Sequence, residues 1–227
     1  MMAELRIAPK AELASIAAGY LAAEIRSSLA DHGRCCYCAL SGGSSPKGLL
    51  LELGKQKISW EKVIFSMVDE RFTNDTTQQN ETMMREFVDA LPAPGPKLHT
   101  ILGNAPLAAT VEQANVNAEA LPEHLDIVVL GMGLDGHTAS LFPDSTDYQS
   151  AMVDPSRYVK VIPGQAPYPR ISMSYSWLSD AKQQILYIPG KDKLECFRSL
   201  LADPTAVSPI KTLVAQANNL IVFSSED

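Results

Sequence analysis

Residues 125–143 read LDIVVLGMGLDGHTASLFP, and this stretch decides the fold more clearly than any other part of the chain. Its first seven residues, LDIVVLG, form the clearest strand in the sequence, because a short apolar run bounded by turn residues is typical of a buried strand. A polar, glycine-rich segment follows as soon as the strand ends. In α/β proteins such loops lie where ligands bind, beyond the carboxyl ends of the strands.

Apolar runs alternate with helical periodicity on both sides of this strand. Strand patterns occur at 34–40, 63–68, near 98–102, and at 157–162, 170–175, 184–188 and 219–223. Helical patterns occur at 10–31, 46–54, 78–90, 106–120 and 191–202. The alternation predicts an α/β fold of three layers, with a Rossmann-like, mostly parallel sheet carrying helices on both faces. The Pro-rich stretches 92–96 and 163–169 are too short to link domains, so a single domain is expected over residues 1–227.

Composition and charge exclude several classes of protein. The formal net charge is −7 and no basic cluster offsets it, which argues against a nucleic-acid partner. The apolar runs are too short to span a bilayer, and the N-terminal segment lacks a basic region followed by an apolar stretch. We therefore expect a cytoplasmic protein without a membrane partner. The sequence leaves both a monomer and a small homo-oligomer open.

The four cysteines are Cys35, Cys36, Cys38 and Cys196. The first three fall in one apolar run, CCYCAL, where alternate side chains of a strand point to opposite faces. The C-C-x-C spacing is not a usual zinc pattern. We therefore interpret the cysteines as buried, reduced thiols that pack as small hydrophobic groups, and predict no metal site.

The first polar loop is SGGSSPK, residues 41–47, directly after the strand at 34–40. Gly42 and Gly43 allow backbone N–H groups to approach a ligand closely. Ser44 or Ser45 can cap the following helix, and Pro46 suits its first turn. Such a helix start attracts phosphate. Taken alone, the loop is equally consistent with a tight turn that binds nothing, and it is neither a Walker A loop nor a dinucleotide fingerprint.

The second loop begins with Asp69-Glu70-Arg71, after the strand at 63–68. Arg71 can make a planar two-point contact with a carboxylate or a phosphate. The alternative is a solvated turn with an internal ion pair. Asn80 opens the next predicted helix.

The third loop, residues 131–143, carries the strongest functional signal. Three glycines flank Asp135 and His137, which are two residues apart. Histidine is the side chain best suited to accept and return a proton near neutral pH. Asp135 either orients that imidazole or holds a proton itself. We therefore interpret His137 as an acid–base group, although an isolated histidine is more often structural.

The three loops, in this order and spacing, resemble those of the 6-phosphogluconolactonase family. SGGSSP resembles the family's SGGSTP loop, DERF followed by Asn80 resembles its DER…SN segment, and GMGLDGHTASLFP matches its signature almost letter for letter. Downstream, PRISM at 169–173 is similar to PRIT(L/M), and GKDK at 190–193 is similar to GxxK. The resemblance spans about residues 34–213. Ser45 stands in place of a threonine, Thr73-Asn74 in place of Val-Pro, and Gln79 in place of a serine.

The resemblance implies the fold of glucosamine-6-phosphate deaminase. It also implies hydrolysis of 6-phospho-D-glucono-1,5-lactone to 6-phosphogluconate, the second step of the oxidative pentose phosphate pathway, without a metal or an organic cofactor. Its implied partner is therefore the small sugar-phosphate lactone itself. The predicted catalytic residues are His137 as general base, with Asp135 and Arg71. The predicted binding residues are Gly42, Gly43, Ser44, Ser45, Asp69, Asn80, Gly133, Arg170 and Lys193.

Two other functions compete with this hypothesis. An amino-sugar phosphate deaminase–isomerase also has a phosphate loop and a DGH histidine, but its signature is DGHIAFNEP. Alignment on the histidine places Phe142 where that enzyme has a glutamate, and proton transfer between carbons needs this extra carboxylate. A non-catalytic sugar-phosphate sensor is expected to lack the acid–base residue, whereas His137 is present.

Overall fold

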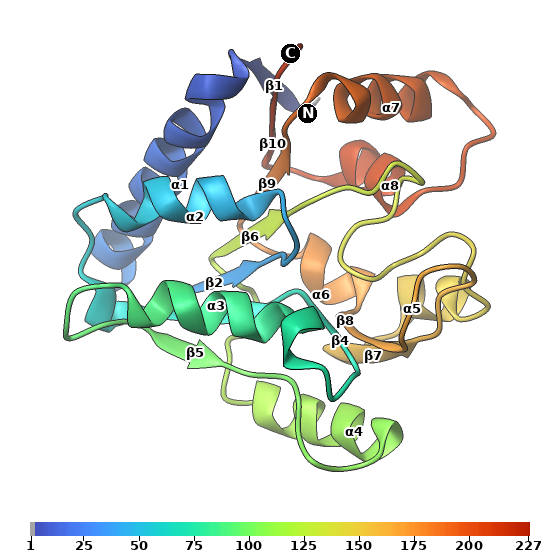
Figure 1. Cartoon of the computed structure of the whole chain (residues 1–227), viewed down its shortest axis with the longest axis horizontal. Helices are drawn as coiled ribbons and strands as arrows, with labels where there is room; N and C mark the ends of the chain where they lie inside the picture. The colour runs from blue at the N-terminus through green and yellow to red at the C-terminus, as the bar shows by residue number, and fades with distance from the viewer. Residues whose placement is uncertain (1–2) are drawn as a thin grey trace.

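A computed structural model describes residues 3–227 of the chain (Figure 1). Its centre is a seven-stranded sheet in the order β1-β10-β9-β6-β2-β3-β5, and every neighbouring pair of strands is parallel. In chain order the strands are β1 (Glu4–Ile7), β2 (Cys36–Leu40), β3 (Val63–Met67), β5 (Lys97–His99), β6 (Ile127–Leu130), β9 (Gln183–Ile188) and β10 (Leu220–Ser224). The predicted parallel α/β fold is confirmed.

The middle of the sheet is apolar because both of its faces are covered. All four residues of β6 and all six of β9 are buried. The helices are α1 (Lys10–His32), α2 (Pro46–Gly54), α3 (Asn80–Asp89), α4 (Leu107–Ala118), α5 (Tyr148–Val153), α6 (Tyr175–Ser179), α7 (Lys191–Ala202) and α8 (Pro209–Gln216). Strands buried on both faces appear in sequence as continuous apolar runs, which is why residues 125–131 gave the clearest pattern.

A second, smaller sheet lies beside the main one and was not predicted. It is antiparallel, in the order β4-β8-β7, and consists of β4 (Asp69–Arg71), β8 (Arg170–Met173) and β7 (Tyr158–Val161). The charged segment 69–71 is therefore a short strand and not a free loop. Its pairing with β8 places Arg71 opposite Arg170.

Several boundaries and short elements also differ from the sequence prediction. The strand expected to reach residue 175 ends at Met173, because Ser174 caps α6 by accepting a hydrogen bond from the Trp177 amide. The expected strand near 98–102 lies at Lys97–His99. The sequence analysis missed β1, β4 and α5, which are only three to six residues long, and α6 and α8.

The expectation that the cysteines are buried, reduced thiols is only partly confirmed. All four cysteines are free thiols, but only Cys36 and Cys38 are fully buried, while Cys35 and Cys196 are partly exposed. Burial raises the pKa of Cys36 to about 12 and also raises that of Cys38 well above its ordinary value. Within residues 3–227, no helix is long and apolar enough to cross a membrane.

Candidate active site

A cavity of about 290 Å³ lies at the carboxyl ends of the central strands, where the three polar loops meet. The first loop follows β2, the second begins just after β3, and the third follows β6. Parallel strands end at the same edge of a sheet, so loops far apart in sequence converge there. Every residue predicted for the site lines this cavity except Asp135, which contacts His137 from outside the wall.

His137 and Asp135 form a hydrogen-bonded pair on the third loop. The distance between His137 Nδ1 and Asp135 Oδ1 is 2.5 Å, and the His137 amide donates to the same oxygen at 3.3 Å. Partial burial alone would raise the pKa of Asp135, but the hydrogen bond and charge of His137 outweigh it and lower that pKa. The carboxylate thus occupies Nδ1 of the imidazole, which leaves Nε2 as the nitrogen available for chemistry.

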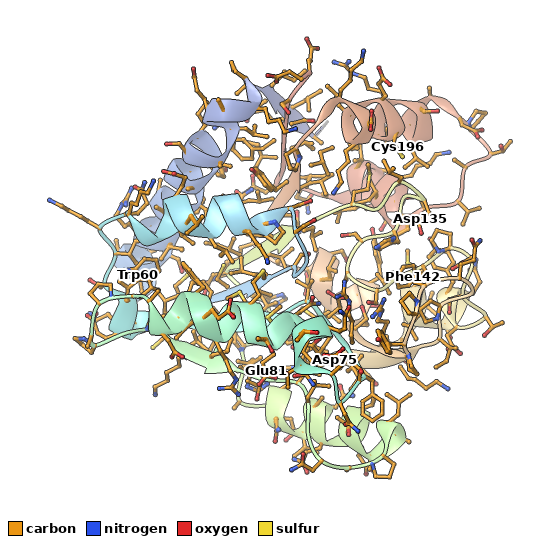
Figure 2. The ribbon with its side chains drawn as sticks, viewed as in Figure 1. Trp60, Asp75, Glu81, Asp135, Phe142 and Cys196 are labelled. Carbon is orange, nitrogen blue, oxygen red and sulfur yellow. The ribbon has the colours of Figure 1, made fainter. Side chains whose placement is uncertain are left out.

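Two neighbours fix the position of this pair. The ring of Phe142 stacks on the imidazole, with ring centroids 4.2 Å apart; Figure 2 labels Phe142 and Asp135 on the same side of the molecule. Gly133 lies directly against the pair, since an added Cβ would stand 2.3 Å from His137 Cε1 and 2.4 Å from Asp135 Oδ1. Only glycine is compatible with this close approach.

The first loop meets a lysine from the other end of the chain. Lys193 Nζ, on α7, donates to Ser45 Oγ at 2.9 Å. The prediction that Ser44 or Ser45 caps α2 is wrong: Ser45 occupies the N-cap position, but no side chain caps this helix. The backbone of Ser45 already has helical angles at this position, and the Ser45 hydroxyl accepts a hydrogen bond from Lys193 instead. Among the residues that the structure describes, no side chain therefore binds the first-turn N–H groups of α2.

Arg170 brings a buried positive charge to the cavity wall. The residue is only 5% exposed, and its Nε and Nη1 have no hydrogen-bond partner within the part of the chain that the structure describes. Burial lowers the pKa of Arg170, and the negative charges of Asp69 and Glu70 oppose that shift. Buried charged donors are costly unless they are paired, so this arrangement favours an anionic ligand.

The remaining polar wall is a network centred on Asp69. The Ser140 hydroxyl donates to Asp69 Oδ2 at 2.5 Å, and Asn80 Nδ2 donates to the Asp69 carbonyl at 3.1 Å. Asn80 opens α3, as predicted. Arg71 Nη1 donates to the Gln78 carbonyl at 2.9 Å, which holds its guanidinium along the cavity.

Comparison with known proteins identifies the family. Residues 8–222 match the family described as glucosamine-6-phosphate isomerases/6-phosphogluconolactonase. The chain belongs to this family. It is 33% identical over 221 residues to a 6-phosphogluconolactonase of Mesorhizobium japonicum, an alignment that covers 91% of this chain and 87% of the relative. A 6-phosphogluconolactonase of Pseudomonas aeruginosa is also 33% identical, with 85% of this chain and 82% of the relative covered.

Solved structures agree with the sequence relatives. The crystal structure of a 6-phosphogluconolactonase from Shewanella baltica superposes with a TM-score of 0.92 at 29% identity, covering 99% of this chain and all of the other. The chain is therefore a member of the 6-phosphogluconolactonase branch of the glucosamine-6-phosphate isomerase/6-phosphogluconolactonase family.

For this family member, the structure also separates the basic residues of the site. Arg71, Arg170 and Lys193 line the cavity. Lys191 does not; its amine lies 3.7 Å from Glu195 on the exposed side of α7. Spacing alone does not separate Lys191 from Lys193, because it does not show which face of α7 turns inward.

Sequence reasoning missed several residues of the cavity wall. Thr138 and Ser140 belong to the third loop, and their hydroxyls donate to the Gly131 carbonyl and to Asp69. Their place inside a signature loop was a usable signal. Tyr187 lines the cavity from β9, within an apolar strand pattern that gave no such signal.

Proposed function

We propose that this protein hydrolyses 6-phospho-D-glucono-1,5-lactone to 6-phospho-D-gluconate by histidine-assisted attack of water. The observation that carries the proposal is the hydrogen-bonded Asp135–His137 pair at a cavity whose wall also holds Arg71, Arg170 and Lys193. A general base and several cations facing one small space suit an anionic substrate that undergoes hydrolysis.

In the proposed reaction, His137 Nε2 takes a proton from water as the water oxygen attacks the lactone carbonyl. The carbonyl π bond opens and its oxygen becomes an oxyanion. When the oxyanion collapses, the bond to the ring oxygen breaks and His137 returns the proton to that oxygen. Asp135 holds Nδ1 and stabilises the imidazolium formed between the two transfers. Every step uses groups of the chain, the substrate and water.

The oxyanion needs donors that are already in place before the reaction. Arg71 is one candidate, since its guanidinium is tied to the Gln78 carbonyl at the cavity wall. The backbone of the third loop is another, because Ala139 has a φ of 48°, an unusual conformation for a residue with a side chain. Donors fixed in advance stabilise a developing charge without further reorganisation.

The first loop, together with Lys193, is suited to bind the phosphate. Gly42, Gly43, Ser44 and Ser45 precede α2, whose first N–H groups have no side-chain cap, and Lys193 reaches the same loop. A helix start with free N–H groups and a nearby ammonium group is suited to bind phosphate. Arg170 adds the unpaired donors Nε and Nη1 to the same cavity.

The same geometry disfavours the deaminase–isomerase alternative. The place of the additional carboxylate is taken by Phe142, whose ring covers the imidazole. Asp69 is the carboxylate within the cavity wall; the Ser140 hydroxyl donates to its Oδ2 at 2.5 Å, and Asn80 Nδ2 lies 3.5 Å from its Oδ1. Hydrolysis needs only one group that takes up and returns a proton, which His137 supplies.

The test is to incubate the purified protein with freshly prepared 6-phosphogluconolactone and to subtract the spontaneous rate. We expect enzyme-dependent formation of 6-phosphogluconate, and no ammonia release from glucosamine 6-phosphate in a parallel assay. Sustained ammonia production with no acceleration of lactone hydrolysis would replace this proposal with the deaminase.

A further inference from the structure

Glu70 is a fully buried carboxylate that the proposed reaction does not use. It lies in β4 between Asp69 and Arg71, has no solvent exposure and faces away from the cavity. Its Oε1 accepts the backbone N–H of Arg71 at 2.6 Å and that of Asn80 at 2.8 Å. Its Oε2 accepts the N–H of Glu81 at 2.7 Å. One side chain thus binds three backbone donors.

The segment 71–80 leaves β4 and returns to begin α3. Arg71 lies at its start, and Asn80 with the adjacent Glu81 lies at its end. Figure 2 places Asp75 on this segment and Glu81 at the start of the helix. Contacts inside the segment also close it, because Arg71 Nη1 donates to the Gln78 carbonyl and Gln79 Nε2 to the Thr73 carbonyl. The segment is therefore a closed loop with a carboxylate at its base.

The first turn of α3 depends on this carboxylate. The N-cap residue Gln79 makes no side-chain capping bond. Glu70, on the preceding strand β4, instead accepts the N–H groups of the first two helical residues. Acceptors at a helix start satisfy N–H groups that have no partner within the helix, and so fix its position.

We propose that Glu70 is a positioning residue: its carboxylate joins the two ends of segment 71–80 and so holds Arg71 and Asn80 in the site. The effect on catalysis rests on the proposed function, because it acts through residues assigned to lactone hydrolysis. Neither oxygen of Glu70 is left for substrate, and a shorter or uncharged side chain cannot accept all three donors in this geometry.

The experiment is a double-mutant cycle with Glu70→Gln as the first change. The amide keeps one acceptor oxygen but presents an NH₂ donor to one of the N–H groups, so the segment must shift. Misplacement by about 1 Å can cost up to about 100-fold in rate. We expect kcat/KM for the lactone to fall at least about tenfold, whereas Glu86→Gln, the same substitution on the exposed side of α3, leaves it within about twofold.

The second arm repeats Glu70→Gln in a chain that already carries Arg71→Ala and Asn80→Ala. A residue that acts through Arg71 and Asn80 loses its effect when both are absent, so we expect less than about a twofold further change. The same fold-loss in both backgrounds would overturn the proposal, because it would indicate a merely structural role. No loss in the wild-type background would also overturn it.

Hydrogen exchange keeps the proposal testable if Glu70→Gln fails to fold or if the wild-type protein lacks lactonase activity. Glu70→Asp retains the charge but is one methylene shorter. We expect the amides of Arg71, Asn80 and Glu81 to exchange at least about tenfold faster in this variant, with core amides of β6 unchanged. Unchanged exchange at the three amides would contradict the positioning role of Glu70. An inactive wild-type protein whose Glu70→Asp variant shows the faster exchange would contradict only the proposed lactonase activity.

Discussion

At the scale of single residues, Gly133 determines whether His137 and Asp135 can lie as close together as they do. A Cβ at this position would meet both His137 and Asp135 at 2.4 Å or less, so Gly133→Ala must push one of them aside. We expect kcat to fall at least about tenfold while the far-ultraviolet circular dichroism spectrum is unchanged. Gly103→Ala is the control, because a Cβ there meets no atom within 4 Å. A Gly133→Ala enzyme with normal kcat would show that the pair tolerates displacement.

The contact between Asp135 and His137 could be predicted because the two residues are two positions apart in one loop, so their proximity is a local property. His137 Nδ1 lies 2.5 Å from Asp135 Oδ1, a contact that fits the orienting role considered for Asp135; that role stays a prediction. The Lys193–Ser45 contact joins residues 148 positions apart, and no local pattern reports such a contact. For the same reason, the capping role expected for Ser45 was wrong.

At the scale of secondary-structure elements, the buried Glu70 carboxyl at the start of α3 predicts that stability depends on pH. Burial raises the pKa of Glu70 from 4.5 to about 7. The charge of Asp69 adds to this rise, whereas the hydrogen bonds from three backbone N–H groups oppose it. Other charged groups near it are Arg71 on the same strand, Arg170 on β8 and Glu81 on α3.

The direction in which stability changes with pH follows from this raised pKa. Between about pH 4.5 and 7 the folded chain keeps a proton that the unfolded chain has released, so this group's contribution to stability falls as pH rises. We expect the free energy of unfolding of the wild-type protein to decrease relative to Glu70→Gln by up to about 3 kcal/mol across this range. Denaturant unfolding at several pH values measures the difference. Parallel pH profiles for the two proteins would contradict the assignment.

Long elements were predictable from sequence and short ones were not. The limits of α2 and α7 agree with the prediction because Pro46 and Gly190 mark their starts and each has a clear periodic pattern. By contrast, β4 is three residues long and charged, so it resembles a polar turn. Its strand character comes from antiparallel pairing with β8, 99 positions away at the Arg71–Arg170 pair, and only the tertiary structure supplies that partner.

The net negative charge of the whole molecule repels its proposed substrate, which is an anion. The net charge is −7, so binding of a phosphate ester must depend on the local cations around the cavity. We expect unphosphorylated gluconolactone to be used with at least about a 100-fold lower kcat/KM, because binding energy from a remote group can position the reacting centre. Inorganic phosphate should inhibit competitively, and Lys193→Met should weaken that inhibition. Equal efficiency on both lactones would contradict a phosphate site in the 41–46 loop.

The parallel sheet explains why this site could be anticipated without a structure. Strands 34–40, 63–68 and 125–131 were recognisable, and once they are parallel neighbours their following loops must meet at one edge. The observed order places β6, β2 and β3 side by side, as this inference requires. The antiparallel sheet that brings Arg170 to the cavity was not foreseeable in the same way, because its strand β4 is only three residues long and lies far along the chain from β7 and β8.

The most direct test of the central claim is the rate of lactone hydrolysis by His137→Ala, measured beside the wild-type protein with the spontaneous rate subtracted. His137 lies on a loop and is partly exposed, so its removal should leave the fold intact. Loss of a general base typically costs about 10²–10⁴ in rate, and we predict a fall in this range. A folded His137→Ala protein that keeps more than about half of the wild-type turnover would contradict this mechanism, because a general base is expected to contribute far more.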